Sequence, residues 1–187
     1  MLFLCVADLH GGPFQPPAFT GRPNAVLLLG DLEWSVEKVV KMFPDVPLFG
    51  VPGNHDPRID PFYGIPAVNL HGRVVEFRGL RIGGLGGCLR YKSGDGFLFW
   101  DAEYGEILKK MPAVDVFVSH CPPAGIPWCD PPAGGTGWHG ARQLLPTKVG
   151  SMQAPAVIFH FSGGPVFSNR QAGFSSPRAT RCHKGYS

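Results

Sequence analysis

Four short apolar runs, each followed by side chains that can bind a ligand, constrain the fold of this chain more than any other feature. They occupy residues 2–7, 25–29, 46–51 and 114–119. Short apolar runs bounded by turn residues are typical of strands that are buried on both faces. Between the second and third runs, residues 35–43 carry apolar side chains at helical spacing. A strand, a helix and a further strand in this order imply parallel strands and a right-handed crossover, so we expect an α/β fold.

The rest of the pattern adds a hairpin, a second helix and one more strand. Residues 74–77 and 81–85 are two short apolar segments separated by a turn, as in a β-hairpin. Residues 101–111 begin with Asp101, which we expect to cap a helix, and repeat apolar side chains along one helical face. Residues 156–160 are a candidate for one further strand.

Composition excludes several classes of protein. Hydrophobic residues make up 44% of the 187 residues and charged residues 17%, which is not the composition of a disordered chain. No apolar run reaches the roughly 18–20 residues that a membrane-spanning helix needs, and the first residues lack the basic start of a signal peptide. The five cysteines include no CxxC pair, which argues against a disulfide framework. We therefore expect a cytoplasmic protein that does not bind membranes.

The pattern of strands and helices ends near Phe161. We expect a domain over residues 1–162 and an irregular basic tail, without strand or helix, over residues 163–187. All 14 acidic side chains lie in residues 1–130, whereas residues 131–187 carry six basic side chains and no acidic one. Such a split is found in chains that bind nucleic acid. The basic side chains are scattered here, so nucleic acid is only a weakly indicated partner.

Polar side chains follow each predicted strand, and together they suggest a metal site. Asp8 and His10 follow the first run, Asp31 the second, Asn54 and His55 the third, and His120 ends the fourth. In open α/β sheets, ligands bind beyond the carboxyl ends of the strands. Oxygen and imidazole ligands together suit transition metals such as Mn, Fe or Zn better than Ca or Mg. Each signal is weak by itself, but their ordered combination is specific.

These motifs resemble those of the calcineurin-like metallophosphoesterases, over roughly residues 1–160. The resemblance depends on Asp-Leu-His at 8–10, Gly-Asp at 30–31, Gly-Asn-His-Asp at 53–56 and the strand-end histidine of Val-Ser-His at 118–120. Residues 84–91 (GLGGCLRY) are similar to a bacterial branch of small members. The resemblance implies a four-layer α/β/β/α sandwich of two mixed sheets flanked by helices.

The resemblance also implies a role for each site residue. Asp8 and His10 would bind one metal ion, Asp31 would bridge two ions, and Asn54 and His120 would bind the second. His55 would be an acid beside the scissile phosphate, where Asn54 and His55 would contact the substrate. The two divalent ions would be Mn, Fe, Zn or Ni.

Such a site suits the hydrolysis of phosphate esters, which are anionic and repel hydroxide. Two cations about 3.5–4 Å apart can clamp the phosphoryl oxygens, neutralise developing charge and acidify a water molecule. A neighbouring histidine can protonate the leaving group. We therefore expect a metal-dependent phosphoesterase that acts on a phosphomonoester or a phosphodiester. Asp56 either orients His55 or caps the turn, and the sequence favours neither role.

One departure from the family pattern weakens this expectation. The family motif Gly-His-x-His is absent, and the nearest match is residues 159–162 (FHFS). His160 matches the first histidine and would be a further ligand of the second ion, unless it is an ordinary buried histidine. Ser162 replaces the second histidine, so the first ion would lack a ligand unless Ser162 or His183 supplies it. The alternative function is therefore a catalytically impaired scaffold or interaction module with the same fold.

Overall fold

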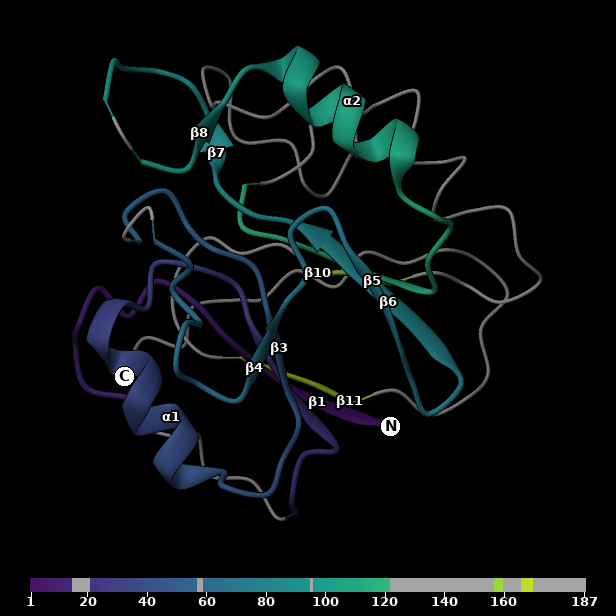
Figure 1. Ribbon diagram of the computed structural model, residues 1–187. Helices are drawn as coiled ribbons and strands as arrows, with labels where there is room; N and C mark the ends of the chain where they lie inside the picture. Colours follow the sequence, from purple (N-terminus) through teal and green to yellow (C-terminus); the bar gives the residue numbers. More distant parts are fainter. Residues whose placement is uncertain (15–20, 57–58, 95, 122–156, 160–165, 170–187) are drawn as a thin grey trace.

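Two mixed β-sheets form the centre of the protein. The computed structural model describes residues 1–14, 21–56, 59–94 and 96–121, together with the backbone of 157–159 and 166–169. The first sheet has the strand order β11-β1-β2-β3-β4 (Figure 1). Its strands are β1 (Leu2–Val6), β2 (Ala25–Leu28), β3 (Leu48–Gly50), β4 (Ala67–Asn69) and β11 (Val166–Asn169). Strands β1 to β4 are parallel, and β11 pairs antiparallel with β1.

The second sheet has the strand order β10-β9-β6-β5. Its strands are β5 (Val74–Phe77), β6 (Leu80–Leu85), β9 (Val116–Ser119) and β10 (Val157–Phe159). Strands β6, β9 and β10 are parallel, and β5 is antiparallel to β6. A separate pair of short parallel strands, β7 (Cys88–Leu89) and β8 (Leu98–Phe99), lies beyond the end of β6.

The predicted strands and the hairpin are confirmed, although the strands are shorter than the apolar runs. The run over 46–51, for example, contains only the three-residue strand β3. The start of that run belongs to a turn, where Val46 donates a backbone hydrogen bond to Phe43, and at its end Val51 donates to the carbonyl of Leu28 in β2. The predicted parallel pairing of β2 with β3 is confirmed, with Leu27 opposite Phe49.

Side chains along each strand of the first sheet point alternately to its two faces, so the sheet contributes to two separate core clusters. On one face, Phe3 and Cys5 of β1 pack in a buried cluster with Ile82 and Val118 of the second sheet. On the other face, Leu4 and Val6 pack in a cluster that includes side chains of α1 (Val36–Met42). Because successive strand side chains point to opposite faces, one apolar run serves both clusters.

The outer face of the second sheet is covered by α2 (Asp101–Lys110). Tyr104 and Leu108 of this helix form a buried cluster with Leu85 of β6 and Phe117 of β9. Helices therefore cover the outer faces of two mixed sheets, as Figure 1 shows with α1 and α2 on opposite sides. The fold is a mixed α/β fold, and the complete four-layer sandwich stays a prediction because much of the chain after Cys121 lies outside the described residues.

The helix predicted over residues 35–43 is confirmed as α1, but the prediction for the start of α2 is wrong. Asp101 does not cap α2; it is the first helical residue, and Trp100 occupies the capping position. The carboxylate of Glu103 accepts the backbone N–H of Trp100 at 2.5 Å, which satisfies one of the free donors at the helix start. A 3-10 turn, η1 (Glu33–Ser35), precedes α1 and takes up the start of the helix predicted from residue 35.

The expectation that no strand follows Phe161 is also wrong. Strand β11 pairs with the edge of β1, with Leu2 opposite Asn169 and Cys5 opposite Val166. An isolated segment of four residues shows too little periodicity to be recognised in sequence, and its pairing depends on a strand more than 150 residues away. The division at residue 162 stays a prediction, although this pairing counts against it. None of the helices in the described ranges has the length and hydropathy that crossing a bilayer requires.

Candidate metal centre

The loops after β1 and β2 are tied together by backbone hydrogen bonds. Asp8 donates its N–H to the carbonyl of Gly30 at 3.0 Å, and His10 donates to the carbonyl of Asp31 at 2.9 Å. The parallel strands end at the same sheet edge, so the polar residues that follow them meet there. This pairing brings the side chains of Asp8, His10 and Asp31 to one place although they come from two loops.

The backbone at these three residues is strained. The φ values are 51° at Asp8, 46° at His10 and 54° at Asp31. They fall in the left-handed region, which residues other than glycine rarely adopt. Such conformations concentrate at functional sites and persist only where the surrounding contacts impose them. The three residues with this backbone conformation are also the three whose side chains come together in one cluster.

Two glycines allow the loops to approach closely. A Cβ atom on Gly53 would collide with Oδ1 of Asp31, and one on Gly30 would lie 2.5 Å from the backbone nitrogen of Gly53. Both positions therefore require glycine. The glycines of the Gly-Asp and Gly-Asn-His-Asp motifs have a packing role at the site rather than a chemical one.

Asp56 holds the loops of β2 and β3 together. Its carboxylate, which is buried, accepts the backbone N–H groups of Asp31, Leu32, Glu33 and Gly53 at 2.7–3.1 Å. These four bonds satisfy amides that would otherwise lack a partner in a buried turn. The structure therefore favours the capping role of Asp56 over a role in orienting His55.

Asp8, His10 and Asp31 form one cluster that can hold a cation. One ligand atom from each residue lies within 4.8 Å of the other two. Nε2 of His10 is 3.8 Å from Oδ1 of Asp8 and 3.9 Å from Oδ2 of Asp31. Two carboxylates and an imidazole around a gap of this size are a donor set that suits a divalent transition metal.

His120 also lies beside Asp31 and is almost fully buried. Its Nδ1 is 2.7 Å from the carbonyl oxygen of Leu29, so Nδ1 carries a hydrogen and Nε2 faces the site. Nε2 is 3.4 Å from Oδ2 of Asp31 and 3.1 Å from Oδ1 of Asn54. The side chains of Asp31, Asn54 and His120 therefore converge.

The charges of Asp31 and His120 stabilise each other. Burial disfavours the charged form of His120, but the hydrogen bond with Asp31 and the charges of Asp31 and Asp8 outweigh burial and raise the pKa of His120 to about 9. Burial would likewise raise the pKa of Asp31, but its hydrogen bond with His120 lowers that pKa. A metal ion and a proton would therefore compete for Nε2 of His120.

His55 is placed beside this group by its backbone. Its N–H donates to Oδ1 of Asp31 at 2.8 Å, which leaves the imidazole free to point outward. The ring is exposed and packs edge-on against His10, with ring centroids 5.3 Å apart and planes at 75°. His55 therefore borders the cluster on the side that a substrate can reach.

The structure brings together Asp8, His10, Asp31, Asn54, His55 and His120. His160 lies outside the described residues, as do Ser162 and His183, the two candidates for the missing ligand. The role of His160 as a ligand therefore stays a prediction.

Tyr91 is a neighbour of the site to which sequence reasoning assigned no role. Its hydroxyl oxygen is 3.5 Å from Nδ2 of Asn54. Tyr91 ends the stretch 84–91 that carries part of the family resemblance, which was the available signal. Its proximity to Asn54 depends on a contact across 37 positions of the chain, which no local pattern reveals.

Comparison with known proteins agrees with this geometry. A family model described as calcineurin-like phosphoesterase matches residues 1–148. An uncharacterized protein of Haemophilus influenzae is 36% identical over 98 residues, which cover 48% of this chain and 43% of that protein. The match thus spans less than half of the relative's length. The crystal structure of TT1561 of Thermus thermophilus superposes with a TM-score of 0.58 at 15% identity, covering 87% of this chain and 82% of TT1561.

The structural likeness to TT1561 supports the fold, and the family match covers most of the chain, including every described residue of the candidate site. The chain belongs to the calcineurin-like phosphoesterase family.

Proposed function

We propose that this protein hydrolyses phosphate monoesters or diesters at a site that holds two divalent metal ions. The observation that carries the proposal is the position of Asp31. Oδ2 of this carboxylate is 3.9 Å from Nε2 of His10 and 3.4 Å from Nε2 of His120. One carboxylate between two imidazoles can offset the mutual repulsion of two cations, as a bridging ligand must.

The ligands divide into two sets that share Asp31. Asp8 and His10 complete the first set, and Asn54 and His120 complete the second, with His160 as a further proposed ligand. The donors are oxygen and imidazole nitrogen, which suit Mn, Fe, Zn or Ni. Mn is the first ion to test.

The residues around the ions would position the substrate and supply a proton. When bound, two divalent ions supply Lewis-acid chemistry that polarises phosphoryl oxygens and makes water a better nucleophile. Asn54 would help to orient the phosphate through its side-chain amide. His55, whose exposed ring borders the site, would protonate the leaving oxygen, a role that an imidazole can fill near neutral pH.

A scaffold is the second candidate function. It is favoured by residues 159–162 (FHFS), which depart from the Gly-His-x-His pattern of the family. The convergence of six site residues counts against it, because a protein–protein scaffold does not need a strained cluster of charged side chains. For either function, we expect a cytoplasmic protein with a four-layer sandwich fold.

Metal content and hydrolysis measured on one preparation separate the two functions. The full chain is loaded with Mn²⁺, and bound metal is measured by mass spectrometry while p-nitrophenolate release is followed from p-nitrophenyl phosphate and bis(p-nitrophenyl) phosphate. We expect turnover that disappears with a chelator and returns with Mn²⁺. If the protein shows no turnover with Mn, Ni, Co, Fe or Zn, the scaffold is the better description.

A further inference from the structure

Residues 8–12, the segment that carries two of the proposed metal ligands, are held by contacts on two sides. On the side of the first sheet, the backbone N–H groups of Asp8 and His10 donate to carbonyls in the loop after β2. On the side of α1, the carbonyls of Gly11 and Gly12 accept hydrogen bonds from side chains of η1. The position of this segment therefore depends on η1 as well as on the sheet.

The indole ring of Trp34 lies directly against Gly11. Its Nε1 donates to the Gly11 carbonyl at 2.9 Å, and a Cβ atom on Gly11 would collide with the six-membered part of the ring. Gly11 also has a φ of 72°, a conformation that glycine adopts readily and other residues do not. Position 11 thus requires glycine for two reasons, and the absence of a side chain there leaves room for the indole.

The hydroxyl of Ser35 makes the second contact. Ser35 is fully buried, and its Oγ donates to the carbonyl of Gly12 at 2.6 Å. Ser35 occupies the N-cap position of α1, where a serine side chain usually accepts a backbone N–H of the helix. Its side chain makes no such capping bond at this helix start, so the hydroxyl serves the loop after β1 instead. Nζ of Lys38, in the first turn of α1, lies 3.5 Å from the same carbonyl.

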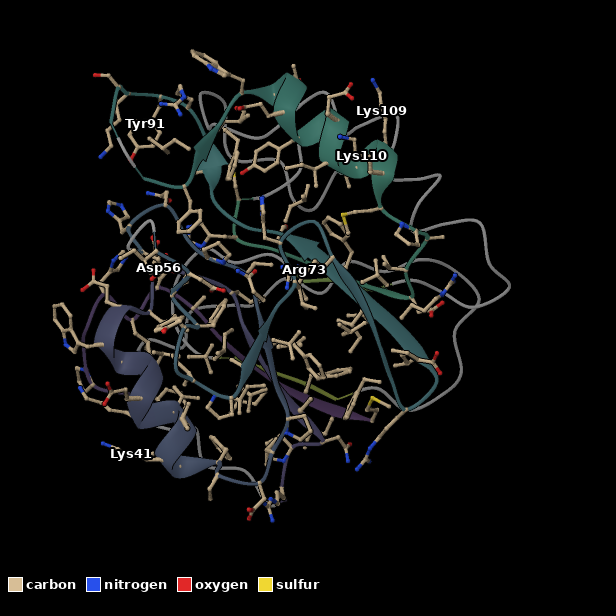
Figure 2. The ribbon with its side chains drawn as sticks, in the orientation of Figure 1. Lys41, Asp56, Arg73, Tyr91, Lys109 and Lys110 are labelled. Atoms are coloured by element: carbon tan, nitrogen blue, oxygen red, sulfur yellow. The ribbon has the colours of Figure 1, made fainter. Side chains whose placement is uncertain are left out.

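The turn η1 is itself held in place by Asp56. The buried carboxylate of Asp56 accepts the backbone N–H groups of Leu32 and Glu33, at the point where η1 begins. Figure 2 shows Asp56 near the start of α1, with Lys41 toward the other end of the helix. Because η1 is fixed in this way, its side chains can impose a position on the loop after β1.

His10 needs this support because its own side-chain contacts do not fix it. The side chain is 49% exposed, and Nε2 lies 3.8 Å from Oδ1 of Asp8 and 3.9 Å from Oδ2 of Asp31. Both distances are longer than a hydrogen bond. The left-handed backbone at Asp8 and His10 persists only where surrounding contacts impose it. The contacts of Gly11 and Gly12 with η1 follow directly in sequence and supply such a constraint.

We propose that Trp34, assisted by Ser35, is a positioning residue that keeps the first ligand set in place for a metal ion. In this role Trp34 touches neither the ion nor the substrate, and it acts through the backbone of residues 8–12. The inference rests on the ligand roles of Asp8 and His10 proposed above, and it adds a residue outside both ligand sets. Direct contact of the indole with a substrate is the competing role, because the ring is 66% exposed.

A Mn²⁺ titration of the full chain tests the effect on metal binding, with free Mn²⁺ measured by electron paramagnetic resonance. The binding step that disappears in His10→Ala identifies the first ligand set. Trp34→Ala should weaken that step by about tenfold and change the other step by less than about twofold, because only the loop after β1 loses a support. Trp34→Phe, which keeps a ring over Gly11 but loses the N–H donor, should recover part of the loss.

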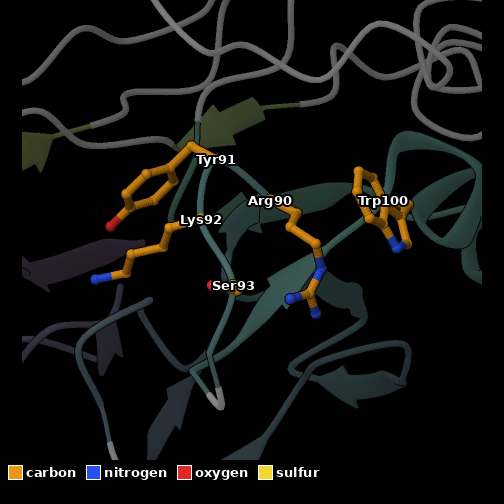
Figure 3. Close-up of a pocket in the computed structure, with 5 residues that line it drawn as sticks. All are labelled: Arg90, Tyr91, Lys92, Ser93 and Trp100. Atoms are coloured by element: carbon orange, nitrogen blue, oxygen red, sulfur yellow. The ribbon is translucent and has the colours of Figure 1, made fainter.

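Trp100→Ala is the matched control for the loss of an exposed indole. Trp100 is 61% exposed, against 66% for Trp34, and it lies at the start of α2 (Figure 3). Both Mn²⁺ steps should keep the affinities of the unmodified protein in this control. Unchanged affinity of the first ligand set in Trp34→Ala would overturn the proposal.

Hydrogen exchange followed by NMR in the presence of a chelator tests the same role without metal. The N–H of His10 donates to the carbonyl of Asp31, and the N–H of Gly12 donates to that of Leu9, so both amides report on the segment. In Trp34→Ala both should exchange at least about tenfold faster while the amides of β2 and β3 keep their rates, because a local opening leaves the rest of the fold intact. An equal acceleration in β2 and β3 would show a general loss of stability and would overturn the positioning role.

Steady-state kinetics keep this inference separate from the proposed function. At low Mn²⁺, Trp34→Ala should hydrolyse p-nitrophenyl phosphate more slowly than the unmodified protein, and about tenfold more Mn²⁺ should restore kcat. A raised KM for the substrate at saturating Mn²⁺, with unchanged Mn²⁺ affinity, would overturn the proposal and assign Trp34 to substrate contact. Absence of hydrolysis in the unmodified protein would contradict the proposed function alone, whereas unchanged Mn²⁺ binding and unchanged exchange in Trp34→Ala would contradict this inference alone.

Discussion

The two halves of the candidate metal centre are built differently. In the half that belongs to the loop after β1, the His10 side chain is 49% exposed and the Asp8 side chain 25%. In the half at the end of β9, the His120 side chain is only 8% exposed and both of its ring nitrogens have polar neighbours within 3.1 Å. The buried half is thus ordered before metal binds, whereas the exposed half depends on backbone strain at Asp8 and His10.

This difference indicates which half of the centre binds metal more tightly and which half water and substrate can reach. A ligand imidazole whose other nitrogen bonds a carbonyl, as in His120, is fixed in tautomer and orientation, and such outer contacts strengthen metal binding. No equivalent bond between the His10 ring and a carbonyl occurs in the part of the chain that the structure describes. We infer that the buried half holds metal more tightly and that the exposed half admits water and substrate.

Removing the group that the halves share should have the largest effect. In Asp31→Asn the carboxylate charge is lost while the side chain keeps its size, so both ions should bind more weakly and hydrolysis should fall to the level measured without added metal. Metal analysis and p-nitrophenyl phosphate turnover check this. Asp45→Asn, at an exposed ion pair with Arg22, is the control and should keep full activity. Two tightly bound ions in Asp31→Asn would refute the bridging role.

Changing His55 should affect turnover but neither half of the metal centre. His55→Ala should lower kcat by roughly 10²–10⁴-fold, the usual contribution of a general acid. The bound metal should stay at the level of the unmodified protein, because Asp31 receives only the backbone N–H of His55. Loss of either ion in this variant would show that the imidazole is a ligand rather than an acid.

Replacing Asp56, which holds the loops of β2 and β3 together, should mainly lower the stability of the protein. Asp56→Ala removes a buried carboxylate that accepts four backbone N–H groups, so we expect the free energy of unfolding to fall by about 2–4 kcal/mol. Chemical denaturation followed by circular dichroism measures this. Asp45→Ala, whose side chain is 81% exposed, should change stability by less than about 0.5 kcal/mol. If Asp56→Ala lowered the free energy of unfolding by as little as Asp45→Ala, water would be replacing the carboxylate as the acceptor of these four N–H groups.

A metal titration compares the metal affinities of the two halves directly. We expect two binding steps whose affinities differ by about 10- to 100-fold, with the buried half filled first and activity rising with the second step. His120→Ala should remove the tighter step, and His10→Ala the weaker one. Two equally tight sites in the unmodified protein would contradict this account and show that a residue outside the described ranges completes the exposed half.

An ion pair far from the metal centre should give the smallest effect and a clean pH dependence. Oδ2 of Asp115 accepts the backbone N–H of Arg81 at 2.8 Å, and both carboxylate oxygens lie 3.3 Å from its guanidinium. Burial would raise the pKa of Asp115, but the bonds from Arg81 lower it below its ordinary value of 3.8. The stabilisation is therefore full above pH 3.8 and is lost as the pH falls through the lowered pKa.

We expect Asp115→Asn to lower the free energy of unfolding by about 1 kcal/mol at pH 7. The difference from the unmodified protein should shrink as the pH falls from about 4 through the lowered pKa of Asp115, because both proteins then become neutral at this position. Urea denaturation at several pH values checks this, and a difference that stays constant down to about pH 2, below the ordinary range for a carboxyl group, would show that the hydrogen bonds act without the charge.

The apolar runs and the residues after them were enough to predict much of the fold and of the site. The parallel pairing of β2 with β3, the hairpin of β5 and β6, and the positions of Asp8, Asp31 and Asn54 after the first three strands all follow from local patterns. The reason is that a buried strand needs a run of apolar side chains, and parallel strands end at one sheet edge. Those constraints act over a few residues and can be read without the rest of the chain.

Only the tertiary structure decided the role of Asp56, the start of α2 at Asp101, the pairing of β11 with β1, and the position of Tyr91 beside Asn54. Each depends on partners that local sequence does not name: the carboxylate of Asp56 bonds amides more than 20 positions away, and Tyr91 meets an amide 37 positions away. The sequence by itself therefore determined which residue types stand at the strand ends. Packing of the two sheets and their loops decided which of these residues meet, because contacts between distant segments form only when the whole core closes.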